Sequence, residues 1–152
     1  MTTAAHPRPR WSTDRSGTIL GTLGLVSWAV CLFALLSSSA LDHQKDIGPY
    51  LFLGEITLLT VLGFTASAFA APFRSWSGSV TLAASGALAT LVALGWWTIG
   101  LGILPSAMFF LAAGVLLSSR RPAGVAVPVG AFLVGIVTQC LITLAIHAAM
   151  RS

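Results

Sequence analysis

Charged residues are scarce in this sequence. Eight basic and four acidic residues make up 8% of its 152 positions, whereas an ordinary soluble domain carries about 25%. Hydrophobic residues supply 56% of the chain, and the mean hydropathy is +0.91. So few ionisable groups cannot cover the surface of a water-soluble fold. The composition therefore argues against a soluble enzyme, a nucleic-acid-binding domain or a secreted disulfide scaffold, and it predicts an integral membrane protein.

Cysteine is equally rare. Cys31 and Cys140 form no C-x-x-C pair and no Cys/His cluster, which excludes the usual zinc, iron–sulfur and thioredoxin-like spacings. Each lies inside an apolar run, so we interpret both as small hydrophobic residues, with a redox or disulfide role as the alternative.

Catalytic signatures are missing as well. The chain has no G-x-S-x-G, no H-E-x-x-H, no acidic pair suited to acid–base catalysis and no phosphate-binding glycine loop. Asp42, His43 and Asp46 are residue types that bind metal ions, but three such residues in one loop are better explained as a solvated connection. We therefore expect no enzyme activity, no catalytic residue, no metal and no cofactor.

Long apolar runs are what the sequence does contain. A helix rises about 1.5 Å per residue, so roughly 20 apolar residues cross a hydrocarbon core of about 30 Å. The runs predict an all-α membrane bundle of five transmembrane helices, at about 17–41, 50–71, 79–98, 102–119 and 124–150. Residues 1–16 lack an apolar period and predict a basic, disordered, cytoplasmic tail.

Two of these spans have an alternative interpretation. The tail and Ser38-Ser39-Ala40 resemble the ends of a cleaved signal peptide, but the first apolar run is longer than the usual signal core. The uncharged stretch 78–119 is about twice the length of one span. We place its break at 98–105, where two glycines precede Pro105; a re-entrant segment is the alternative.

The net charge of +4 reports orientation rather than a nucleic-acid partner, because the basic residues lie between the apolar runs. If the spans alternate, Lys45 and Arg151 lie on one side, and six arginines lie on the other: Arg8, Arg10, Arg15, Arg74, Arg120 and Arg121. The positive-inside rule then predicts a cytoplasmic N-terminus and an outward C-terminus in a bacterial-type plasma membrane. Aromatic residues at span ends predict interface anchors at Tyr50, Trp76, Trp96 and Trp97.

Small residues recur at four-residue spacing, as at Ser79, Ala83 and Ala87 and at Gly17 and Gly21. Such spacing lets helices approach closely in lipid. Because the pattern is common in membrane helices, we expect packing within the bundle, with dimerisation as the alternative.

One polar ridge follows the last span. Gln139, Thr143 and His147 recur every four residues, after Gly135. Glu55 is the only acidic residue inside any span, and an isolated carboxylate in hydrocarbon is costly. We therefore expect Glu55 to be protonated, turned toward water or paired with a group such as Gln139 or His147. These four residues, Glu55, Gln139, Thr143 and His147, are the candidate polar pocket in the outer half of the bilayer.

Two function classes follow. The first is a non-catalytic membrane subunit or interaction protein, with the lipid bilayer and a membrane-protein partner or a second copy as its partners, and with Glu55 and Gln139 as structural contacts. The second is a small transporter or channel component that moves protons, a cation or a small solute past the polar pocket.

Overall fold

The computed structural model describes residues 11–38, 48–68, 76–95, 100–119 and 126–151. These residues form five helices and no strand. The helices are α1 (Trp11–Ser37), α2 (Gly48–Ala68), α3 (Ser77–Leu94), α4 (Gly100–Ser118) and α5 (Ala126–Arg151). Each is long and apolar enough to cross a membrane, so the prediction of an all-α architecture with five candidate spans is confirmed.

The helix ends differ from the predicted spans by a few residues, and the largest difference is at the N-terminus. Helix α1 begins at Trp11, so residues 11–16, predicted to be disordered, are helical. Once a helix exists, each added residue gains one further hydrogen bond, so the helix continues past the end of its apolar run. Hydropathy therefore predicts where the apolar residues lie, but not where the helix begins and ends.

The third and fourth spans are separate helices, as predicted, but the break lies earlier than the predicted 98–105, and residues 100–105 are helical. Helix α3 ends at Leu94, α4 begins at Gly100, and the Gly100 amide donates to the Gly95 carbonyl at 2.7 Å. A Cβ on Gly100 would lie 2.5 Å from the Val92 carbonyl oxygen, so this close approach requires glycine. Pro105, the last residue of the predicted break, lies inside α4.

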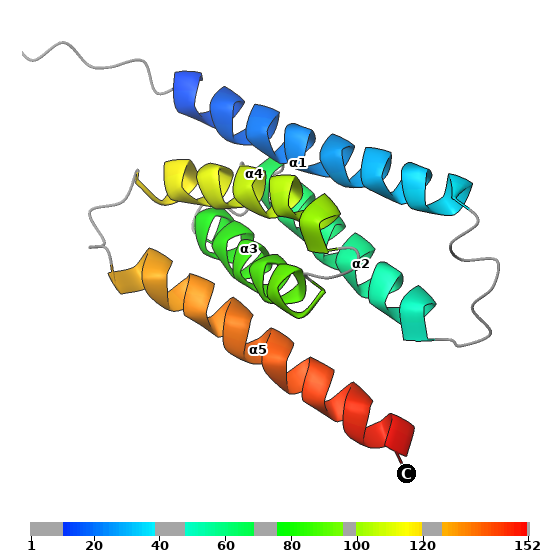
Figure 1. The fold of residues 1–152 in the computed structure, drawn as a ribbon. Coiled ribbons are helices and arrows are strands. Elements are labelled where there is room, and N and C mark those ends of the chain that lie inside the picture. The colour runs from blue at the N-terminus through cyan, green and yellow to red at the C-terminus, as the bar shows by residue number, and fades with distance from the viewer. Residues whose placement is uncertain (1–10, 39–47, 69–75, 96–99, 120–125, 152) are drawn as a thin grey trace, which may run out of the picture.

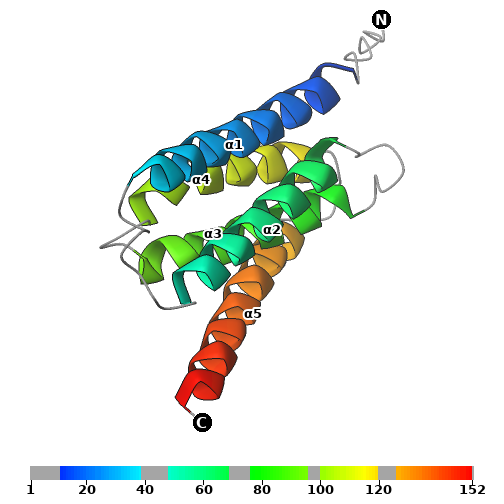
Figure 2. The same ribbon diagram turned by 90° about the vertical axis from the view of Figure 1, so that its right-hand side faces the viewer.

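The helices alternate in direction. In Figure 1, α1, α3 and α5 run one way, and α2 and α4 run the other. Helix α3 lies at the centre, packed against α2, α4 and α5, while α1 covers α2 and α4. Figure 2 shows α5 crossing the bundle and extending away from it at its C-terminal end.

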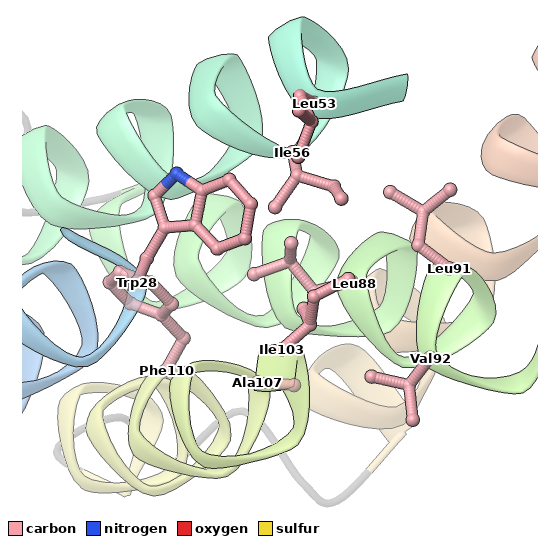
Figure 3. Packing of buried hydrophobic residues seen from close by; sticks show 9 residues of the cluster. All are labelled: Trp28, Leu53, Ile56, Leu88, Leu91, Val92, Ile103, Ala107 and Phe110. Atoms are coloured by element: carbon pink, nitrogen blue, oxygen red, sulfur yellow. The ribbon is translucent and has the colours of Figure 1, made fainter. Parts of the chain in front are cut away.

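The core lies where α1 to α4 meet, and Trp28, Ile56, Leu88 and Phe110 are its largest fully buried apolar side chains from these four helices. Figure 3 shows Trp28 reaching into this cluster from α1, with its indole nitrogen toward α2. That nitrogen donates to Thr57 Oγ1 at 3.1 Å. Interhelical hydrogen bonds of this kind stabilise membrane bundles by about 0.6 kcal/mol on average.

Phe110 fills the crossing of three helices. Its ring approaches Gly24 of α1 and Gly63 of α2 so closely that a Cβ at either glycine would lie 3.1 Å from a ring carbon. One turn earlier on α4, the buried Ser106 hydroxyl donates to the Gly24 carbonyl at 2.9 Å. Small residues thus hold α1, α2 and α4 together, as expected for packing within the bundle.

Candidate polar site

The most polar contact inside the bundle joins α2 to α5. Gln139 Nε2 donates a hydrogen bond to Glu55 Oε1 at 2.8 Å. Glu55 is the eighth residue of α2, which places it about 10 Å along the axis from the helix start. Gln139 is only 1% exposed, and Glu55 is half-buried. The structure therefore brings together two of the four predicted pocket residues.

Only side chains make this connection. Among the described residues, no Cα of α2 lies within 8 Å of a Cα of α5, because both helices flank the central α3. Glu55 and Gln139 are long enough to meet across that separation. A shorter side chain at either position would leave the other without this partner.

The predicted ridge on α5 faces the bundle over most of its length. At Gly135, a Cβ would overlap the Ala83 carbonyl of α3, so α5 and α3 are in backbone contact there. Gln139 follows one turn later, and the half-buried Thr143 hydroxyl donates to the Gln139 carbonyl at 3.0 Å. The ridge is the packing face of α5.

His147 does not join the pair. It lies two turns beyond Gln139 on α5, at an exposed position, and no hydrogen bond joins it to Glu55 or Gln139 within the described part of the chain. The physical reason is the crossing of α5 over α3, which carries the C-terminal turns of α5 away from the other helices (Figure 1).

The structure describes some of the predicted interface and topology residues and not others. Arg15, Tyr50 and Trp76 are exposed near helix ends. The other predictions fall outside the described residues: the tail before Trp11, Ser39 and Ala40, the loop with Asp42, His43 and Asp46, Arg74, Trp96 and Trp97, and Arg120 and Arg121.

Metal-ligating side chains do not gather in the described segments, where no group of three or more His, Cys, Asp or Glu residues could hold an ion. Cys31 faces Gly102 of α4, and Cys140 is exposed on α5. Both are free thiols.

Sequence reasoning missed the polar groups buried among α1, α2 and α4. The Trp28–Thr57 and Ser106–Gly24 hydrogen bonds connect residues that no motif or spacing distinguishes from the apolar residues around them. Thr60 is also fully buried, and its hydroxyl is the one buried side-chain polar atom without a partner among the described residues. For Thr57, Thr60 and Ser106, a hydroxyl within an apolar run was the only signal available.

The pair at this site consists of one carboxyl group and one carboxamide. These groups can form hydrogen bonds and exchange a proton, but they supply no nucleophile–base pair.

Comparison of the chain with protein-family models, with curated proteins and with solved structures gives no match.

Proposed function

We propose that this protein is a non-catalytic membrane subunit or interaction protein that binds a helix of a partner membrane protein through the C-terminal half of α5. The observation that carries the proposal is the exposure of residues 140–149, which we name the α5 arm. Every residue of the arm except Thr143 is exposed. No other helix in the described part of the chain ends in so long a run of exposed residues.

The composition of the arm suits helix association in lipid. Ala145 and Ala148 have small side chains, and the exposed His147 can form a hydrogen bond across helices. Within the bundle, small residues such as Gly86 and Gly135 are already in contact with neighbouring helices. Helices associate in membranes through small and hydrogen-bonding residues. The arm exposes residues of the same kinds as those that join the helices within the bundle.

The proposal includes the orientation. The starts of α1, α3 and α5 and the ends of α2 and α4 lie at one end of the bundle (Figure 1). Of the six arginines on one side of the predicted membrane, three precede α1 or lie at its start. The other three lie in the segments between α2 and α3 and between α4 and α5. By the positive-inside rule this end faces the cytoplasm of a bacterial-type plasma membrane, and the α5 arm lies in the outer half of the bilayer.

Site-specific photocrosslinking in native membranes tests the proposal. A photoreactive residue replaces Leu144 of the arm, and the matched control replaces Met108 of α4; the two are 65% and 58% exposed. We expect a protein adduct from position 144 and only lipid adducts from position 108. Lipid adducts alone at both positions would contradict the proposal. An adduct with a second copy of this chain would show that the arm mediates homo-oligomerisation and does not bind a different protein.

A second candidate function, a small proton or cation transporter component, is favoured by the Glu55–Gln139 hydrogen bond. Intramembrane carboxylates commonly mark ion and proton pathways. In proteoliposomes, Glu55→Gln should abolish proton- or ion-dependent flux while the protein stays folded. Unchanged flux, or loss of assembly alone, would assign Glu55 to packing.

A further inference from the structure

The Glu55–Gln139 pair can remain hydrogen-bonded whether or not the carboxyl group carries a proton. We propose that this pair is a proton-binding site, in which the Glu55 carboxyl group takes up and releases one proton and the Gln139 carboxamide adjusts to each state. The inference narrows the ligand of the second candidate function to the proton, but it concerns binding and does not require transport.

The chemistry of the partner side chain is the first argument. A carboxamide has an NH₂ donor and a carbonyl acceptor, whereas lysine and arginine have donors only. With the Glu55 carboxylate, Gln139 donates through Nε2, as observed at 2.8 Å. With the carboxylic acid, a half-turn of the amide about its terminal torsion, which is broad and roughly two-fold, lets its carbonyl accept the acid O–H.

The second argument is the lack of a fixed positive charge on the helices around Glu55. Helices α2, α3 and α4 contain no lysine, arginine or histidine. Arg151 of α5 lies twelve residues, about 18 Å along the helix, beyond Gln139. The titratable or charged residues on α1, α2 and α5 besides Glu55 are Asp14, Arg15, Cys31, Tyr50, Cys140, His147 and Arg151.

A proton fits this site better than a metal ion does. Metal ions require several oxygen, nitrogen or sulfur ligands, and the described residues form no such cluster. A proton needs one carboxyl oxygen. The balanced step is transfer of a proton from a hydronium ion to the Glu55 carboxylate, which gives a carboxylic acid and water; no electron moves.

The pair also has an exposed side. Gln139 is 1% exposed, whereas Glu55 is half-buried. The adjacent Gly54 is exposed, and a Cβ there would meet no atom within 4 Å. Glu55 is therefore the more accessible member of the pair, and Gln139 is the inner one.

The sequence makes the test unusually direct, because Glu55 is the only glutamate and Gln44 and Gln139 are the only glutamines. The full-length protein is labelled with ¹³C at the glutamate carboxyl carbon and ¹⁵N at the glutamine side chain, in lipid bilayers, and followed by solid-state NMR as pH is varied. Gln44→Asn leaves Gln139 as the single glutamine signal.

We expect the Glu55 carboxyl resonance to shift between its ionised and neutral values with the slope of one proton, and the Gln139 carboxamide resonance to shift over the same pH range. In Gln139→Lys, a donor-only partner should hold the Glu55 resonance at its ionised value throughout the range in which the wild type titrates. Thr138→Val, at an exposed α5 position, is the matched control and should titrate as the wild type does.

A Glu55 resonance that does not move over the range in which the protein stays folded would overturn the proposal. So would a Glu55 resonance that titrates while the Gln139 resonance stays constant. If Gln139→Lys does not fold, the labelled wild type decides the question by itself. Crosslinking at position 144 does not involve Glu55, so failure of this proposal leaves the interaction function unaffected, and the reverse also holds.

Discussion

Helices α3 and α5 lie side by side but differ in how far the fold covers them. In the most apolar 18-residue stretch of each, 67% of the residues of α3 are buried against 11% in α5. Yet α5 is the more hydropathic of the two. Helix α3 is rich in Gly, Ala, Ser and Thr, so burial in this protein follows small size, which permits close packing, rather than hydropathy.

The largest difference between α3 and α5 should appear when a leucine is truncated. Leu88 of α3 is fully buried, whereas Leu144 of α5 is 65% exposed. Leu88→Ala leaves a cavity among α1, α2 and α4 and should lower the free energy of unfolding by about 2–5 kcal/mol. Leu144→Ala should change it by less than about 0.5 kcal/mol. Thermal or denaturant unfolding in detergent checks both, and equal losses would show that α5 is covered in the folded protein.

Adding volume tests the same contrast from the opposite direction. A Cβ on Gly86 of α3 would meet the Phe132 backbone of α5, whereas one on Gly130 would meet nothing within 4 Å. Overpacking should make Gly86→Leu less stable by about 1–3 kcal/mol, and Gly130→Leu should be close to neutral. The same unfolding assay measures both variants. Destabilisation of Gly130→Leu would show that another segment packs against α5 at Gly130.

The Glu55–Gln139 bond should matter to α5 more than to α3. Gln139→Leu removes the side-chain hydrogen bond from α5 to α2, at an expected loss of about 0.6–1.7 kcal/mol. Hydrogen exchange by mass spectrometry should show faster exchange in α5, with α3 unchanged. The control is Thr138→Val, and a uniform increase over all helices would contradict a local role.

The smallest expected effect concerns two hydroxyl groups on α2, those of the half-buried Thr57 and the fully buried Thr60. Thr60 Oγ1 has no partner, whereas Thr57 Oγ1 accepts from Trp28. Thr60→Val should therefore leave the free energy of unfolding unchanged or raise it by up to about 1 kcal/mol, because an unpaired buried hydroxyl is removed. Thr57→Val should lower it by about 0.6 kcal/mol. A destabilised Thr60→Val in the unfolding assay would show that this hydroxyl has a partner in the membrane.

Parts of the candidate site were predictable. The four-residue spacing placed Gln139 and Thr143 on one face of α5, and the cost of an isolated carboxylate suggested a partner for Glu55. The choice of Gln139 over His147 was not predictable, because both lie on the same ridge and only the crossing of α5 over α3 separates them. For the same reason, the sequence could not show that Trp28 donates to Thr57, since helix register is set by packing.

The sequence by itself determined that this chain forms five apolar helices, because hydropathy and helix length are local properties. It also indicated a break between the third and fourth helices, although it placed that break several residues too late. Only the tertiary structure decided that α3 lies at the centre, that α5 extends past its neighbours and that Glu55 bonds Gln139. The physical reason is that lipid tails and protein interiors are similarly apolar, so hydropathy cannot tell a lipid-facing residue from a packed one. Shape complementarity between helices makes that distinction, and it exists only in the assembled bundle.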